Sequence, residues 1–84
     1  MERYEIGMLA RSKAGHDKGH VYVIFQVDET YVYLMDGSSR KLENPKKKKK
    51  KHVQLICEKH VLSGLDDVAI KRILKLFDKE TGRN

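Results

Sequence analysis

Cysteine and long apolar runs are almost missing from this 84-residue chain, and both absences limit what the protein can be. With one cysteine, Cys57, the chain forms no internal disulfide, so we expect a reducing compartment. The longest apolar run, Val21–Phe25, is far shorter than the ~20 residues of a membrane-spanning helix. The opening residues MERYEIGM carry charges where a signal peptide has an apolar segment. We therefore expect a cytoplasmic protein with no membrane partner.

Catalytic and metal-binding patterns are lacking as well. The sequence has no nucleophile elbow and no phosphate-binding P-loop, and the pair Asp66-Asp67 is better explained as a helix cap. The spacings His16-x-x-x-His20 and Cys57-x-x-His60 resemble metal-ligand pairs, but zinc sites usually need four ligands in paired sets. We expect no enzyme, no metal and no cofactor, and we predict that Cys57 is a small core residue.

Positive charge, in contrast, is concentrated in one segment. Lys and Arg total 18, Asp and Glu total 12, and the net charge is +6. The run Lys46–Lys51 holds six of these cations, so the rest of the chain balances at 12 against 12. A neutral domain with one cationic segment favours a polyanionic partner, namely RNA, DNA or an acidic membrane.

Alternation of apolar and polar residues predicts short strands at 4–12, 20–28, 31–36, 38–43 and 52–58. In the second strand the odd positions, from Val21 to Val27, are predicted to face the core, with Tyr22 and Ile24 on the other face. In the third, Val32 and Leu34 are expected inward, and Tyr31, Tyr33 and Met35 outward. Val53, Leu55 and Cys57 share one side of the last strand. The lysine run is predicted to be a loop.

The last third of the chain changes period. Ile70, Ile73, Leu74 and Phe77 form one apolar stripe, which predicts a helix at about 66–79, begun by Asp66 or Asp67, that covers an open side of the strands. Five short strands followed by one helix indicate a mainly β protein: a small SH3-like barrel at about 4–58 with a C-terminal α-helix. An OB-fold is the competing interpretation. We expect one domain, 1–84, that is a monomer when free.

The segment IGMLARSKAGHDKGHVYVIFQVDETYVYLMDG resembles a KOW motif, the strand–glycine loop–strand element of several ribosomal proteins and NusG-type transcription factors. With the later DGSSRKLENPKKKKKKH, the chain is similar to large-subunit ribosomal proteins of the L-fourteen-e type and their short bacterial relatives, from about Ile6 to about Leu55. The resemblance implies an SH3-like barrel that binds RNA, often ribosomal RNA, beside ribosomal proteins. It points to Gly15, Asp17, Lys18 and Gly19, to Asp36, Gly37 and Arg40, and to Pro45, the lysines and His52.

Physical reasons support several of these positions. Two glycines in AGHDKG let a backbone approach a phosphate, although a plain hairpin loop in which Asp17 bonds local amides explains them too. Of six adjacent lysines, about three or four can reach phosphates, and such contacts detect charge rather than sequence. A flexible solvated loop, a localisation signal or an anionic-lipid patch are the alternatives. The predicted RNA-binding residues are Arg11, Lys13, Gly15, His16, Lys18, Gly19, Arg40, Lys46, Lys47, Lys48, Lys49, Lys50, Lys51 and His52.

Tyrosines offer a further RNA contact. Tyr22, Tyr31 and Tyr33 are predicted to share the outward sheet face, where they either stack on bases or lie under the helix. Two other functions remain open: a protein-interaction module, since SH3-like barrels also bind peptides, and an accessory of transcription elongation.

Overall fold

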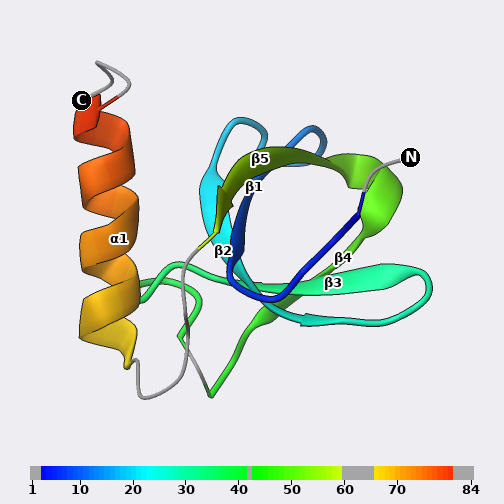
Figure 1. The fold of residues 1–84 in the computed structure, drawn as a ribbon. Helices are drawn as coiled ribbons and strands as arrows, with labels where there is room; N and C mark the ends of the chain where they lie inside the picture. Colours follow the sequence, from blue (N-terminus) through cyan, green and yellow to red (C-terminus); the bar gives the residue numbers. More distant parts are fainter. Residues whose placement is uncertain (1–2, 42, 60–65, 81–84) are drawn as a thin grey trace.

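Five antiparallel strands form one curled sheet with a helix beside it (Figure 1). The computed structural model describes residues 3–41, 43–59 and 66–80, with only the backbone of residues 57–59 and 80. The elements are β1 (Met8–Ser12), β2 (Val21–Val27), β3 (Tyr31–Met35), β4 (Lys46–Lys49), a 3-10 turn η1 (Lys50–His52), β5 (Val53–Lys59) and α1 (Asp67–Glu80). The strand order is β4-β3-β2-β1-β5. The chain thus folds as a small SH3-like barrel with a C-terminal helix, as the sequence predicts.

The barrel interior holds the first of two apolar clusters. Its buried members are Ala10, Tyr22, Ile24, Val32, Leu34 and Val53, contributed by strands β1, β2, β3 and β5. Val32 and Leu34 point inward as predicted, and Val53 and Leu55 of β5 join them. The side chain of Cys57, predicted to lie in the core, falls outside the described part.

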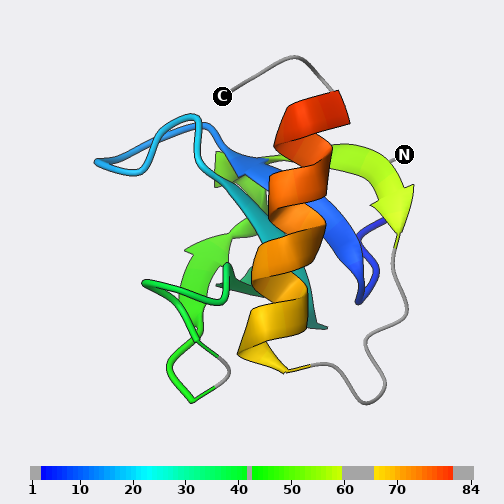
Figure 2. The same cartoon turned by 90° about the vertical axis from the view of Figure 1, so that its left-hand side faces the viewer.

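The second cluster lies between the outer face of the sheet and α1 (Figure 2). Ile70, Leu74 and Phe77 are buried against residues of β1, β2 and β3, and Ile73 packs at the edge. This confirms the predicted stripe. The helix begins at the predicted place because the Asp66 carboxylate accepts the Ala69 N–H at 2.9 Å, an N-cap interaction. The helix covers Val21, Val23 and Met35, not the tyrosines.

The face prediction for β2 is wrong because both of its faces are buried. Val21 and Val23 lie under α1, and Tyr22 and Ile24 lie inside the barrel. A β-bulge then changes the alternation: Ile24 pairs with Leu34 and Gln26 with Tyr33, so Phe25 has no partner. After this extra residue, Val27 packs toward the barrel interior. Strict alternation predicts neither the burial of both faces of β2 nor the bulge.

Two predicted strands also need correction. The first, 4–12, is shortened, because a turn at Gly7 (φ +96°) precedes β1 and the Met8 N–H bonds the Glu5 carbonyl. At 38–43 the structure has turns instead of a strand, with Leu42 outside the described residues. There the Asp36 carboxylate accepts the N–H groups of Ser38 (2.9 Å) and Arg40 (2.8 Å), which bends the chain back on itself.

The lysine run is not a loop. Lys46–Lys49 form β4, which pairs with β3 in the register Leu34–Lys46, Tyr33–Lys47, Val32–Lys48 and Tyr31–Lys49. Lys50–His52 then form η1, which leads directly into β5. Irregular segments at 36–41 and 43–45 lie where the fourth strand is predicted, and the lysines form the fourth strand instead.

Candidate nucleic-acid interface

Strand pairing divides the lysine run into two faces. Side chains that are directly opposite in a β-ladder point to the same face, and successive residues alternate. Because Val32 and Leu34 point into the barrel, their partners Lys48 and Lys46 do too. The side chain of Lys48 is 11% exposed and that of Lys46 28%. These two cations are therefore partly withdrawn from solvent.

Asp17 of the glycine loop forms ion pairs with both inward lysines and offsets one of their two charges. Its carboxylate oxygens lie 3.0 Å from Lys48 Nζ and 3.2 Å from Lys46 Nζ. Burial raises the pKa of Asp17, but hydrogen bonds from Lys48 and three other side chains outweigh it and hold the pKa well below its ordinary value. The carboxylate thus stays ionised under all ordinary conditions, and it binds side chains rather than the local amides of a plain hairpin loop.

The same carboxylate also accepts hydrogen bonds from two hydroxyl groups inside the barrel. Ser12 Oγ donates to it at 2.9 Å and the Tyr22 hydroxyl at 2.8 Å. Burial, followed by the bond to Asp17, raises the pKa of Tyr22 well above its usual range. Tyr22 is only 3% exposed inside the barrel. It therefore does not lie on the outward face, where it is predicted, and it is unable to stack on a base. The loop, β1, β2 and β4 thus meet at one charged group.

The outward face of β4 carries the remaining cations. Lys47 and Lys49 are exposed and lie beside Tyr33 and Tyr31, their partners in the ladder. Lys47 Nζ stands 4.2 Å from the centroid of the Tyr31 ring, a cation–π contact. In η1, Lys51 is exposed as well.

Lys50 and His52, the other two residues of η1, are half-buried. Lys50 Nζ lies 5.3 Å from the centre of the Tyr4 ring, and the Tyr4 hydroxyl donates to the Lys50 carbonyl at 3.2 Å. The lysines that face solvent most are therefore the alternate ones, Lys47, Lys49 and Lys51.

The glycine loop adjoins the lysine segment at two points. Lys48 Nζ donates to the Ala14 carbonyl at 3.0 Å, and the Lys13 N–H bonds the His52 carbonyl at 2.8 Å. Gly15 (φ +86°) and Gly19 (φ +91°) adopt the left-handed conformation that favours glycine. The predicted contact side chains Lys13, His16 and Lys18 are all exposed on this loop. The structure therefore brings the loop to the inward lysines and to the end of η1.

Arg11 and Arg40 lie in different surroundings. Arg40 belongs to the turn after β3. This turn packs closely against α1, since a Cβ added to Gly37 of the same turn would lie 2.9 Å from the Lys71 backbone nitrogen. Arg11 is half-buried on β1, and its Nε is buried without a hydrogen-bond partner. Both remain predicted RNA contacts, but neither belongs to the lysine face of β4.

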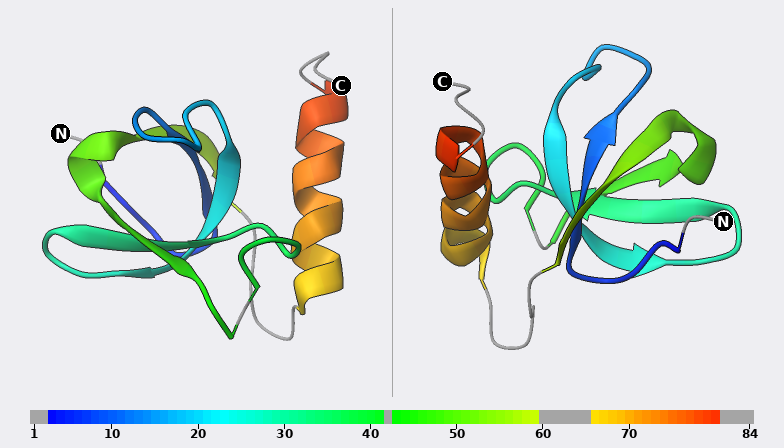
Figure 3. Two further views of the ribbon diagram at one scale, coloured as in Figure 1. Left: turned by 180° about the vertical axis from the view of Figure 1, so that it is seen from behind. Right: turned by 45° about the horizontal axis from the view of Figure 1, so that its top comes forward.

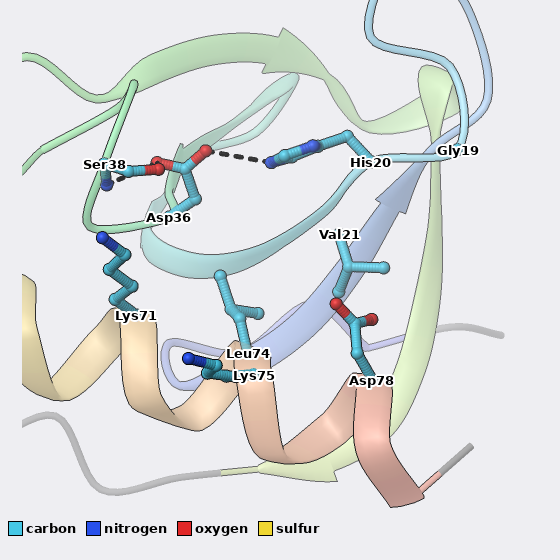
Figure 4. Close-up of a pocket in the computed structure, with 9 residues that line it drawn as sticks. All are labelled: Gly19, His20, Val21, Asp36, Ser38, Lys71, Leu74, Lys75 and Asp78. Atoms are coloured by element: carbon cyan, nitrogen blue, oxygen red, sulfur yellow. Dashed lines mark hydrogen bonds and ion pairs between the residues drawn. The ribbon is translucent and has the colours of Figure 1, made fainter. Parts of the chain in front are cut away.

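An additional feature, not indicated by any sequence motif, is a groove of about 300 Å³ between α1 and the turn at Asp36 (Figure 4). His20 Nε2 lies 2.9 Å from Asp36 Oδ2 at its edge. Burial raises the pKa of Asp36. Hydrogen bonds, of which those from the backbone N–H groups of Arg40 and Ser38 are the strongest, outweigh burial and lower this pKa to about 2. Asp36 is therefore an ionised structural group. The groove is lined by Gly19, His20, Val21, Asp36, Ser38, Lys71, Leu74, Lys75 and Asp78.

Metal and membrane features can be stated for the described ranges alone. Within 3–41, 43–59 and 66–80, no group of three or more His, Cys, Asp or Glu side chains is arranged to hold a metal. His20 contacts Asp36 while His16 is exposed, and His60 is outside the described residues. Within the same ranges, no helix is long and apolar enough to cross a membrane.

Neither protein-family models nor curated protein sequences provide a match to this chain.

Proposed function

We propose that this protein binds RNA through the outward lysines of β4 and η1, Lys47, Lys49 and Lys51, with the exposed cations of the glycine loop as further contacts. The observation that carries the proposal is the division of the lysine run. Asp17 pairs with two of the lysines within the fold, whereas the alternate three stay exposed, and the whole excess charge of the domain lies in this run. An ordered row of exposed cations is suited to the regularly spaced phosphates of a nucleic acid.

The contact expected here is electrostatic. Each lysine that neutralises a phosphate releases a counterion, so binding weakens as salt rises, with a slope of about −0.7 to −0.9 per contact on logarithmic axes. Three outward lysines therefore contribute a slope of roughly −2 to −3. Phosphate contacts of this kind fix position on the RNA without reading its sequence.

The test is the salt dependence of RNA affinity, measured by fluorescence anisotropy. We expect the variant Lys47→Gln/Lys49→Gln/Lys51→Gln to bind more weakly and to lose a slope of roughly 2–3. The matched control, Arg72→Gln/Lys75→Gln/Lys79→Gln, removes the same charge from exposed positions of α1 and should keep the slope. Equal slopes in the two variants, or unchanged affinity in the first, would overturn the proposal.

The resemblance to L-fourteen-e-type proteins supports ribosomal RNA as the target, with the protein part of the ribosome or associated with it. On this proposal the protein sediments with the large ribosomal subunit in a sucrose gradient, and the outward-lysine variant is released at lower salt than the wild type. Recovery in the free protein pool alone would instead favour an interaction module or an elongation accessory.

A further inference from the structure

We propose that Tyr31, with Lys47 and Lys49, forms a stacking site for one unpaired base of a single-stranded RNA segment. The site lies on the outer face of β3 and β4. This inference rests on the proposed RNA binding and specifies how part of the RNA is held: the lysines attract the backbone, and the ring selects a base that is not paired.

The first support is that the face is open. The helix packs on Val21, Val23 and Met35, and Met35 lies at the opposite end of β3 from Tyr31. The hairpin joining β2 to β3 extends away from α1, as the views in Figures 1 and 3 agree. Tyr31 and Tyr33 are half-buried, so neither residue is enclosed by the fold.

The second support is that the hairpin is held in place before any ligand binds. The Asp28 carboxylate accepts the Tyr31 N–H at 2.6 Å, the Thr30 N–H at 2.9 Å and the Tyr33 hydroxyl at 3.0 Å. These bonds, with the backbone N–H of Tyr31 first, lower the pKa of Asp28, so the carboxylate remains an acceptor at neutral pH. A fixed turn reduces the entropy lost when a base is bound.

The third support is the position of the cations around the ring. Lys47 Nζ lies over one face of the Tyr31 ring, so on this proposal the base stacks on the other face, and Lys49 is the direct partner of Tyr31 in the ladder. An open hollow of about 310 Å³ next to the hairpin is lined by Glu29, Thr30, Lys49 and Lys51. With the Asp28 carboxylate of the same hairpin included, Lys47, Lys49 and Lys51 still outnumber the carboxylates of Asp28 and Glu29, which suits one phosphate of the strand that carries the stacked base.

An unpaired base is the ligand that fits this combination. In an RNA duplex each base is already stacked and paired, and its flat faces are inaccessible to a ring on a sheet surface. A single-stranded segment can place one base on an aromatic ring while its phosphates meet lysines, the arrangement of sequence-tolerant single-strand binders. The outward lysines alone provide no such preference, since they contact phosphates in either form of RNA.

Tryptophan is absent from the chain, and this makes the test specific. The variant Tyr31→Trp has one indole, whose fluorescence reports directly on stacking. We expect quenching by a single-stranded oligoadenylate but not by an abasic ribose-phosphate oligomer of the same length. We also expect Tyr31→Leu to lose roughly 5- to 150-fold in affinity for the oligoadenylate, and Tyr31→Phe to keep it. Thermal melts of each variant verify that it is folded.

The outcomes separate this inference from the proposed function. If Tyr31→Leu binds the oligoadenylate like the wild type while removal of the outward lysines still weakens it, the stacking site is refuted and RNA binding stands. If the abasic oligomer quenches the indole as strongly as the oligoadenylate does, the stacking site is likewise refuted. If neither oligomer binds, both proposals fail. If oligoglutamate quenches the indole and RNA does not, the face binds an acidic protein segment and the stacking site is again refuted.

Discussion

Replacing Asp17 with alanine should reveal how much of the barrel depends on one carboxylate. Asp17 receives hydrogen bonds from Ser12 and Tyr22 and ion pairs from Lys46 and Lys48. Its side chain is 15% exposed. The alanine variant leaves the Tyr22 hydroxyl inside the barrel without its acceptor, and leaves Lys48 with the Ala14 carbonyl as its remaining partner.

The expected magnitude follows from these partners. A hydrogen bond to a charged group contributes about 1.5–3 kcal/mol, and a buried donor left unsatisfied costs about 1–3 kcal/mol. Lys46 adds less, because its side chain is only partly buried and solvent-screened ion pairs contribute about 0–1 kcal/mol. Since the contributions overlap, we expect Asp17→Ala to lose about 3–4 kcal/mol of unfolding free energy. For a domain of this size that lowers the melting temperature by roughly 15–25 °C.

The assay is urea denaturation followed by circular dichroism, with a double-mutant cycle that adds Lys48→Met. We expect a coupling energy of at least about 1 kcal/mol between Asp17 and Lys48. Asp28→Ala is the control, because it removes an aspartate with three hydrogen bonds from an exposed turn and should cost less. A loss below about 1 kcal/mol for Asp17→Ala, or strict additivity with Lys48→Met, would contradict a central role for this carboxylate.

Two further stability predictions concern the turn after β3. Gly37→Ala should lower the unfolding free energy from urea denaturation by about 2 kcal/mol or more, because φ is +79° and a Cβ would overlap the Asp67 carbonyl of α1. Gly19→Ala, at φ +91° in open space, should cost less, and equal costs would contradict the α1 contact. Asp36 has a pKa lowered from 3.8 to about 2, so its stabilisation is present above pH 3.8 and lost as pH falls through 2. Between pH 5 and pH 2 the unfolding free energy from urea denaturation should therefore fall by about 2 kcal/mol more in the wild type than in Asp36→Asn. Parallel curves would refute the stabilising role of the Asp36 carboxylate.

The sequence predicts the class of fold because its strongest patterns agree with the packing. The stripe from Ile70 to Phe77 is buried as expected, and Val32 and Leu34 face the barrel interior. What it does not predict is that both faces of β2 are buried, because Val21 and Ile24 are equally apolar and the alternation alone does not say that each face packs against a core. The bulge at Phe25 adds to the error, since one extra residue reverses the alternation that follows it.

The lysine run is the larger lesson about the site. Lysine has low strand propensity, and six adjacent like charges repel, so local rules favour a loop. Pairing with β3 and the carboxylate of Asp17 overcome both the low propensity and the repulsion. Neither contact is local, and Asp17 lies 31 residues before Lys48 in the sequence. The sequence indicates both the glycine loop and the lysine run. Which lysines face solvent is decided by the strand register, which the sequence does not show.

The division of the lysine run can be tested with two double variants that remove the same charge. Lys47→Gln/Lys49→Gln removes outward lysines, and Lys46→Gln/Lys48→Gln removes the inward partners of Asp17. Unfolding free energy and RNA affinity are measured for both at one salt concentration. We predict that the outward variant loses RNA affinity and stays within about 1 kcal/mol of wild-type stability. The inward variant should lose about 2 kcal/mol of stability and bind RNA more tightly than the outward one. Equal stability and equal affinity in the two variants would show that the run has no inward and outward face, and would contradict this account.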